Sequence, residues 1–296
     1  MASVDICICT FRRPYLAETL RSVAALAVDG VDLRVIIADN DRVASARDLV
    51  EGIGQDFPWP ITYLHAPAAN ICIARNACLD AARADYVAFI DDDETVCPQW
   101  LSQLLAKAQA SGADAVLGPV RAIYDAATPD WMVRGDFHST LPVVRDGVID
   151  TGYTCNVLIR RVEPFASLRF DLALGRSGGE DTDYFHRLTS MGGTIAQAPE
   201  ALVYEPVPRA RAAMGWLLRR RLRMGQTHGM LLKGARAKAV AVAAAKAGYC
   251  MVMTGLTAFS PIRARKNLLR AALHVGVVGG ILGVRQATHY GESPRR

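Results

Sequence analysis

Short apolar runs alternate with segments of helical spacing through the first third of the chain. Strands are predicted over Val4–Cys9, Val31–Ala38, Ile61–His65 and Tyr86–Ile90. Helices are predicted between and around them over residues 14–23, 44–53 and 71–82. Short apolar strands that alternate with helices indicate a mainly parallel sheet that is covered on both faces. The sequence therefore predicts an α/β fold.

Polar side chains stand at the carboxyl ends of three of these predicted strands. Thr10, Asp39 and Asp91 occupy the three positions. In sheets of this kind ligands bind in a crevice beyond the carboxyl ends of the strands. We therefore expect the three side chains to line one crevice, and a nucleotide is the ligand that such a crevice favours.

The second half of the chain has a less regular pattern. We expect residues 126–140 to form a polar and aromatic loop. The remaining predictions are helices over Leu101–Ser111 and Asp181–Met191, and strands over Ala115–Val120, Val157–Arg160, Thr194–Ala196 and Leu202–Tyr204.

Four consecutive acids, Asp91-Asp92-Asp93-Glu94, follow the strand-like segment Val87–Ile90 directly. Four carboxylates at close range repel one another unless a cation lies among them. Mg²⁺ and Mn²⁺ favour one or two carboxylates together with phosphate oxygens, which suits a diphosphate ligand at a strand end. The alternative is a solvated acidic turn that caps the helix expected near Pro98.

Other polar residues have both functional and plain structural interpretations. Asp39 and Asn40 can hydrogen-bond a base or a ribose, or can simply form a turn. Arg75, early on a predicted helix, can pair with phosphate or with the acidic run, or can be an ordinary surface arginine. Residues Gly178–Asp183 contain two glycines, which allow a flexible loop, followed by three acids at the start of a predicted helix. A carboxylate there can act as a general base, or can only cap the helix.

Composition limits the class of protein. The 296 residues are 51% hydrophobic and 21% charged, which is enough apolar material for a large core without disulfides. Seven cysteines lie mainly among apolar residues, so we expect free thiols and a reducing, cytoplasmic compartment. The first residues also lack the charged region, apolar run and cleavage site of a secretion signal.

Five ordered motifs resemble the family 2 glycosyltransferases over residues 4 to about 205. They are Cys9-Thr10-Phe11-Arg12-Arg13-Pro14, Ala38-Asp39-Asn40, Ala74-Arg75-Asn76, Phe89-Ile90-Asp91-Asp92-Asp93 and Gly179-Glu180-Asp181. The resemblance implies a GT-A fold, a UDP-sugar donor that carries a hexose such as glucose, a divalent metal, and inversion by single displacement. The chain departs from the common pattern at Cys9, where proline is usual, and at Asn40, where aspartate is more frequent.

The resemblance also implies roles for individual residues. It places the base at Asp181, with Glu180 orienting the acceptor, and the metal at Asp93 and Asp91. The implied nucleotide-sugar contacts are Thr10, Phe11, Arg12, Asp39, Asn40, Arg75, Asp91 and Asp92. Beyond the motifs, Trp216–Arg221 and Gln226-Thr227-His228 are similar to the bacterial succinoglycan-type exopolysaccharide glucosyltransferases.

Basic and apolar residues dominate the chain after residue 208. Arg219–Arg221 and Arg223 precede two apolar stretches, Ala239–Phe259 and Leu268–Val284. Arginines beside apolar helices attract anionic lipid headgroups and suit the pyrophosphate of a polyprenyl-linked acceptor, although a solvated basic helix has the same composition. We expect interfacial helices at the inner face of the cell membrane more than a spanning helix. The residues that we expect to contact the acceptor are Asn156, Trp216, Arg219 and Arg220.

These patterns predict two domains and leave other functions open. A glycosyltransferase domain is predicted over residues 1–208, with a nucleotide-sugar half (1–95) and an acceptor half (96–208), followed by a membrane-associating region over 209–296. A nucleotidyltransferase shares the sheet and the acidic metal ligands, but usually has a glycine-rich phosphate loop, and residues 10–14 contain no glycine. A non-catalytic membrane scaffold with the same fold is the other alternative. No nucleic-acid recognition motif accompanies the basic clusters.

Overall fold

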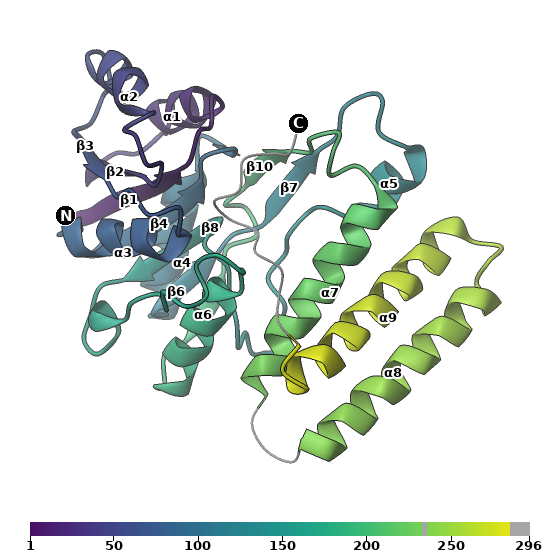
Figure 1. The fold of residues 1–296 in the computed structure, drawn as a ribbon. Helices are drawn as coiled ribbons and strands as arrows, with labels where there is room; N and C mark the ends of the chain where they lie inside the picture. The colour runs from purple at the N-terminus through teal and green to yellow at the C-terminus, as the bar shows by residue number, and fades with distance from the viewer. Residues whose placement is uncertain (233–235, 285–296) are drawn as a thin grey trace. The chain divides into compact units, whose positions relative to one another are not determined.

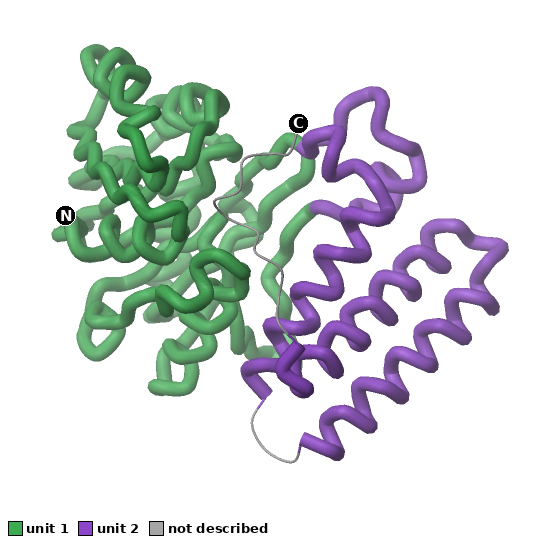
Figure 2. The backbone as a smooth tube through the Cα atoms, viewed as in Figure 1, with its two compact units in different colours: residues 1–122, 139–206, 289–296 green, residues 123–138, 207–288 purple. Residues whose placement is uncertain are grey.

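A computed structural model of the chain describes residues 1–232 and 236–284, and its backbone divides into two units (Figure 2). Within the described residues, unit 1 consists of residues 1–122 and 139–206, and unit 2 consists of residues 123–138, 207–232 and 236–284. We predicted one domain boundary, near residue 208. We did not predict that residues 123–138 would group with the C-terminal helices. Residues 285–296 of the predicted C-terminal region lie outside the described residues.

The main sheet of unit 1 has seven strands in the order β3-β2-β1-β4-β8-β6-β9 (Figure 1). Strands β3, β2, β1 and β4 run parallel, β8 is antiparallel to both β4 and β6, and β9 is parallel to β6. This topology confirms the predicted α/β class with a mostly parallel sheet. The bounds are β1 Ala2–Thr10, β2 Val31–Asp39, β3 Ile61–His65, β4 Tyr86–Asp91, β6 Ala115–Leu117, β8 Asn156–Arg160 and β9 Ile195–Gln197.

Helices cover both faces of this sheet because its strands are apolar on both sides. Ile6 and Ile8 of β1 belong to one buried core, with α1 and α4, whereas Cys7 belongs to the other, with α3 and α6. This alternation follows the two-residue period of a strand. The helices of unit 1 are α1 Leu16–Ala24, α2 Arg47–Gly54, α3 Ile71–Ala81, α4 Trp100–Ser111 and α6 Glu180–Ser190, with a 3₁₀ turn at Phe165–Ser167.

The single strand that we predicted over Ala115–Val120 is wrong, because the chain breaks it into two. Strand β6 ends at Leu117, and Pro119, which has no N–H to donate to a ladder, separates it from β7 (Val120–Ile123). Gly118 permits a close approach here, since a Cβ atom on it would lie 2.4 Å from the carbonyl oxygen of Ala201. Strand β7 then joins a three-stranded sheet in the order β5-β10-β7, with β5 at Thr95–Val96 and β10 at Val203–Pro206.

Unit 2 is helical, and one of its helices lies where we predicted only a loop. Helix α5 (Asp130–Gly135) falls inside residues 126–140. It is short, and its stability comes from packing: Met132 is fully buried in a cluster with Phe137, Leu217 and Leu269. Periodicity over so few residues gives no reliable sequence signal.

Three long helices follow in unit 2, and Figure 1 shows them side by side. They are α7 Met214–Leu231, α8 Arg236–Leu256 and α9 Pro261–Ile281. Helices α7 and α9 approach through glycines: a Cβ atom on Gly225 would lie 2.0 Å from the carbonyl oxygen of Leu273, and one on Gly276 would lie 2.1 Å from that of Leu222. The backbones are therefore in direct contact.

Helix α8 packs on α9 with one side and leaves most of its surface open. Ala243 of α8 is buried with Val277 and Ile281 of α9. Among the described residues, α8 is the one helix that is long and apolar enough to cross a membrane, by length and composition only. Only 17% of its most apolar window is buried inside the protein.

Candidate active site

The carboxyl ends of β1, β2 and β4 lie next to one another in the register that the sequence analysis anticipated. Thr10 pairs with Asp39 across β1 and β2, and Cys9 pairs with Asp91 across β1 and β4. The Thr10 hydroxyl donates a 2.7 Å hydrogen bond to Asp92 Oδ2, and the backbone N–H of Phe11 donates to the same oxygen at 3.2 Å. The end of β1 thus holds the middle acid of the acidic run.

Repulsion within the acidic run is only partly offset by arginines. Arg13 Nη2 lies 3.3 Å from Asp93 Oδ2, and Arg75 Nη2 lies 3.9 Å from Asp91 Oδ1. Desolvation by the surrounding chain raises the pKa of Asp91 to about 8, opposed by Arg75 and reinforced by Asp93, even though 45% of its side chain stays accessible. Burial and repulsion from Asp93 raise the pKa of Asp92 to about 7, while the bond from Thr10 opposes the rise. Asp91 therefore presents an accessible carboxylate that favours an added cation.

Glu94 completes the run but points away from solvent. The backbone N–H of Asp91 donates to Glu94 Oε2 at 2.9 Å, so the fourth acid closes the turn after β4. Burial, and then repulsion from Asp91, raises the pKa of Glu94 well above its usual range. This residue shapes the loop that presents Asp91 and Asp93.

Arg75 of α3 joins the acidic run to the start of α6. Its Nη1 atom donates to Glu180 Oε1 and to Asp181 Oδ1, each at 2.6 Å. The arginine is 5% exposed, and its guanidinium lies 5.5 Å from the centre of the Phe170 ring. Burial opposes its charge, but attraction from Asp181, Glu180 and Asp91 outweighs burial and raises its pKa. Sequence analysis placed Arg75 at the nucleotide, and the structure shows its carboxylate partners.

The two acids at the start of α6 have different surroundings. Asp181 is accessible over 24% of its side chain and also accepts hydrogen bonds from the backbone N–H (3.2 Å) and hydroxyl (3.1 Å) of Thr154. Glu180 is buried, and its Oε2 atom has no hydrogen-bond partner among the described residues. Burial, then repulsion from Asp181, raises the pKa of Glu180, and Arg75 opposes this rise. Asp181 is thus the more accessible carboxylate of the pair.

Two glycines shape the loop that presents these acids. Gly178 and Gly179 have φ angles of 88° and 96°, in a region that side-chain-bearing residues rarely adopt. The three acids in the first turn of α6 lie at the positive end of the helix dipole. The backbone of the loop therefore places Glu180 and Asp181 side by side on Arg75.

Asp39 and Asn40 are buried and bonded within the protein. Asp39 accepts hydrogen bonds from the backbone N–H groups of Asp41 (3.0 Å) and Ala46 (2.9 Å) and from the Tyr63 hydroxyl (2.7 Å). Asn40 donates to the carbonyl oxygens of Ala66 and Asn70, each at 3.0 Å. The two residues organise the loop after β2, beside the carboxyl end of β1, where the backbone N–H of Asn40 donates to the carbonyl oxygen of Thr10 at 2.8 Å.

Arg12 is held at the rim of the same loop. Its guanidinium forms two 2.8 Å hydrogen bonds with Asp41, and half of its side chain is accessible. The φ angle of Arg12 is positive, at 54°, which orients the chain between β1 and α1. Arg12 and Asp41 thus tie the ends of β1 and β2 together.

The predicted acceptor residues lie in two different places. Asn156 is fully buried in unit 1, where its amide group donates to the carbonyl oxygens of Pro119 (3.0 Å) and Ala201 (2.7 Å) and accepts from Trp100 Nε1 (2.8 Å). Both of its amide hydrogens are therefore used inside the core. The other three belong to α7 in unit 2: Trp216 stacks on His138, and Arg220 lies over the Trp216 ring at 5.4 Å. Arg219 is exposed on the same helix.

Sequence reasoning missed Arg13 and Thr154 as members of the site. Arg13 lies within the first motif, so the sequence could have identified it as a member of the site. Its contacts with Asp92 and Asp93 could not be predicted from the sequence. Thr154 precedes β8 and gives no local signal, because its contact with Asp181 depends on the fold. Within residues 1–232 and 236–284, no three His, Cys, Asp or Glu side chains are arranged to hold a metal ion by themselves.

Comparisons with known proteins agree with the resemblance of the motifs. The family model described as glycosyl transferase family 2 matches residues 5–163. The succinoglycan biosynthesis protein ExoM of Rhizobium meliloti is 54% identical over 295 residues, which is 97% of this chain and 96% of the relative. ExoO of the same organism, also a succinoglycan biosynthesis protein, is 29% identical over 60% of this chain and 53% of its own length.

Solved structures show the same fold. A mannosyltransferase from Pyrobaculum calidifontis, in complex with GDP-Man and Mn²⁺, superposes with a TM-score of 0.64 at 16% identity, over 94% of this chain and 86% of the other. Residues 1–349 of TarS from S. aureus superpose with a TM-score of 0.54 at 14% identity, over 98% and 99% of the two chains. These likenesses confirm the predicted GT-A fold.

Proposed function

Because the chain belongs to glycosyl transferase family 2, we propose that it transfers a hexosyl group, such as glucosyl, from a UDP-sugar to a growing exopolysaccharide. The acceptor in this proposal is a saccharide, free or linked to a polyprenyl carrier. The 54% identity with ExoM across nearly the whole of both chains supports a role in polysaccharide synthesis. The observation that carries the proposal is the cluster in which Arg75 joins Asp181 (2.6 Å) to Asp91 (3.9 Å).

The acidic run suits a divalent metal that is shared with the donor. Asp91 and Asp93 supply two carboxylates, and the side chain of Asp91 is 45% accessible, so that a cation can reach it. Two protein ligands leave coordination positions for diphosphate oxygens. Bound there, Mg²⁺ or Mn²⁺ would neutralise the negative charge that develops on the departing diphosphate. The solved relative with Mn²⁺ supports this assignment.

The donor nucleotide, in this proposal, occupies the crevice beyond β1 and β2. Thr10 and Phe11 fix Asp92 at its floor. Asp39, Asn40 and Arg12 fix the loop after β2, on the other side of the crevice. Their role in this proposal is to keep that loop in the conformation that binds the base and the ribose. Arg75 acts through its carboxylate partners, because its guanidinium is already engaged with Glu180 and Asp181.

Asp181 is the proposed general base. A single displacement with inversion needs one carboxylate that removes a proton from the acceptor hydroxyl on the face opposite the leaving nucleotide. Asp181 is accessible and is oriented by Arg75 and by Thr154, whereas Glu180 is buried. The resemblance implied that Glu180 orients the acceptor, but because Glu180 is buried and bonded to Arg75, we assign it instead to positioning Arg75, and through it the base. The proton of the acceptor hydroxyl passes to Asp181 while the new glycosidic bond forms and the bond to the diphosphate breaks.

Acceptor binding and membrane association are assigned to unit 2. Trp216, Arg219 and Arg220 of α7 combine an aromatic face with guanidinium groups, which suits a saccharide that carries a phosphate group. We place the protein in the cytoplasm, peripheral to the inner face of the membrane, because basic residues adjoin the apolar helices of this unit. Asn156 has no part in this proposal, since its contacts are those of a core residue.

A donor panel tests the proposed activity. The purified chain is incubated with UDP-, GDP- and TDP-sugars, with Mn²⁺ or with EDTA, and slow release of the nucleoside diphosphate is measured. We expect a UDP-hexose to be hydrolysed, and metal to be required. Release from no nucleotide sugar, with nucleotide transfer from a nucleoside triphosphate instead, would contradict the proposal and favour a nucleotidyltransferase.

A further inference from the structure

Helix α8 presents an apolar stripe that no other described element covers. The stripe consists of Val242, Ala245, Tyr249, Val252 and Leu256, which recur every three or four residues on one side of the helix. Tyr249, Val252 and Leu256 are 67%, 62% and 64% exposed. The side of α8 that packs on α9 is formed by different residues, chiefly Ala243 and Ala247. An exposed stripe of this length marks an interaction surface.

The turn between α8 and α9 continues this apolar surface beyond the helix. Phe259 is 81% exposed there, two residues before Pro261 begins α9. Basic residues follow at once, at Arg263, Arg265 and Lys266. Apolar side chains with a basic border are typical of helices that lie in a membrane interface.

Charge along the C-terminal helices α7, α8 and α9 has one sign. The sequence contains no aspartate or glutamate between Glu205 and Glu292, and residues 236–284 carry seven lysines and arginines. Anionic lipid headgroups attract such a segment, and each nearby Lys or Arg strengthens the attraction. The charge therefore favours an anionic membrane over an acid-poor or basic protein partner as the occupant of the stripe.

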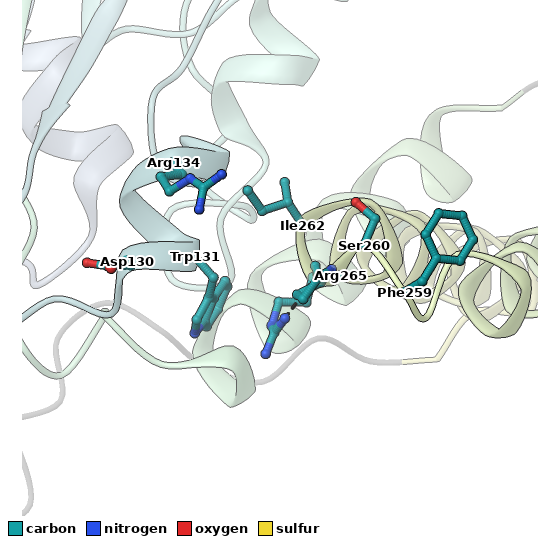
Figure 3. A pocket seen from close by; sticks show the side chains of 8 residues that line it. Asp130, Trp131, Arg134, Phe259, Ser260, Ile262 and Arg265 are labelled. Carbon is teal, nitrogen blue, oxygen red and sulfur yellow. Dashed lines mark hydrogen bonds between the residues drawn. The ribbon is translucent and has the colours of Figure 1, made fainter.

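A pocket of about 500 Å³ lies between α5 and the α8–α9 turn (Figure 3). Trp131 and Arg134 line it from α5, and Phe259, Ile262 and Arg265 line it from the turn and α9. The Arg265 guanidinium lies 4.4 Å from the centre of the Trp131 ring. Asp130 is the one acid among the residues that line the pocket. Neither Arg134 nor Arg265 forms an ion pair with an acid in the described part of the chain. Two guanidiniums with aromatic neighbours suit a phosphate group at a membrane surface.

We propose that unit 2 docks on an anionic membrane through the α8 stripe and the α8–α9 turn, with Arg134 and Arg265 binding the phosphate of a phospholipid headgroup in this pocket. The inference rests on the membrane association proposed above and names its surface. Phe259 and the stripe enter the headgroup and upper acyl region, and the two arginines remain at the level of the phosphates.

Helix α8 lies along the membrane surface in this arrangement and does not cross it. Lys246 stands near the middle of the helix, and a lysine at the centre of a spanning helix is strongly unfavourable. Spanning would also require α8 to leave α9, where Ala243 is buried against Val277 and Ile281. At the surface, Lys246 borders the stripe and extends to the headgroups while the contact with α9 stays intact.

The arginine run of α7, which the sequence analysis placed at the membrane, is partly engaged within unit 2. Arg220 lies over the Trp216 ring and donates to the carbonyl oxygen of His138 at 3.5 Å. Arg221 is partly buried, and this burial, followed by repulsion from Arg220, lowers its pKa. The apolar side chains of the α8 stripe and the turn, by contrast, are exposed.

Flotation of the full chain with vesicles tests this surface. Vesicles consist of phosphatidylcholine alone or mixed with phosphatidylglycerol, and partition into the floating fraction is measured. We expect the chain to float with the mixed vesicles. Arg134→Gln with Arg265→Gln, and separately Leu256→Ser with Phe259→Ser, should each lower partition about tenfold or more.

Matched controls remove the same charge or apolar surface from unit 1. Arg83→Gln with Lys107→Gln replaces two exposed basic residues, and Val148→Ser with Met191→Ser replaces two exposed apolar residues. Both should change partition by less than about threefold, because only residues near the bilayer contribute strongly. Hydrogen exchange of the unmodified chain provides a measurement independent of variant folding, and vesicles should protect residues 249–262.

The outcomes distinguish this inference from the membrane association proposed above. If the unmodified chain floats but the pocket variant matches the Arg83 and Lys107 control, this inference is overturned and the membrane association stands. The inference is also overturned, and the membrane association stands, if Arg219→Gln with Arg223→Gln lowers partition more than the pocket variant does. It is overturned as well if alkaline carbonate fails to release the chain from the vesicles, because that result would indicate that α8 spans the membrane. A chain that never floats refutes both. Nucleotide-sugar hydrolysis, measured without vesicles, reports separately on the transferase.

Discussion

Replacement of Arg75 by methionine should destabilise the protein strongly and in a pH-dependent way. The guanidinium is 5% exposed and bonds Glu180 and Asp181 at 2.6 Å each, so Arg75→Met leaves two carboxylates together without a counter-charge. Removing one partner of a buried ion pair costs about 3–5 kcal/mol. For a protein of this size that corresponds to a fall in Tm of roughly 6–20 °C.

The pH dependence follows from Glu180. Burial already raises its pKa in the folded chain, and Arg75 opposes the rise, so the variant should raise it further. A carboxyl group with a raised folded pKa binds more protons in the folded than in the unfolded state. Stability therefore falls as pH rises from the unfolded toward the folded pKa. We expect the deficit of Arg75→Met to be larger near about pH 8 than near about pH 5.

Urea unfolding followed by circular dichroism measures both effects. Arg21→Met is the matched control, because Arg21 pairs with Glu18 at the surface, with side chains 64% and 53% exposed. Its loss should cost less than about 1 kcal/mol. Addition of Glu180→Gln to Arg75→Met should recover part of the deficit. A loss under about 1 kcal/mol in Arg75→Met, equal at both pH values, would refute the reasoning.

Three further predictions concern the metal, the core and the helices of unit 2. Asp93→Ala should abolish turnover and weaken metal-linked binding of nucleoside diphosphate while circular dichroism stays unchanged; full activity in EDTA would contradict this. Asn156→Ala should lower the urea-derived stability by about 3 kcal/mol or more, because Trp100 Nε1 and the carbonyl oxygens of Pro119 and Ala201 lose a buried partner; an unchanged midpoint would be inconsistent with that role. Gly276→Ala should lower the melting temperature, since its Cβ would meet Leu222 at 2.1 Å, whereas Gly248→Ala, with nothing within 4 Å, should be neutral or stabilising; equal effects of the two would count against the close α7–α9 contact.

The strands and their polar ends could be predicted because their signals are local. The apolar run before Asp91 and the run before Asp39 each specify a buried strand, and parallel pairing then brings their ends together. The predicted juxtaposition with Thr10 is confirmed by the register. The nearly continuous burial of β1 also follows from its nearly continuous apolar run.

The partners of individual side chains could not be predicted in the same way. Arg75 contacts acids that are 105 and 106 residues away in the sequence, and nothing near it specifies this pairing. Asn156 at the start of β8 looked available for a ligand, but Trp100 and two carbonyl groups far along the chain enclose it. Helix α5 was missed because tertiary packing of Met132 stabilises a segment too short to show periodicity.

The kinetics of Asp181→Asn test the central claim most directly, since the account makes this carboxylate the base of a single displacement. The amide keeps the shape of the side chain and cannot accept the proton. We predict that kcat falls by roughly 10²–10⁴ while KM for the nucleotide sugar stays nearly unchanged. A near-normal kcat in Asp181→Asn, with kcat lost in Glu180→Gln instead, would contradict the assignment.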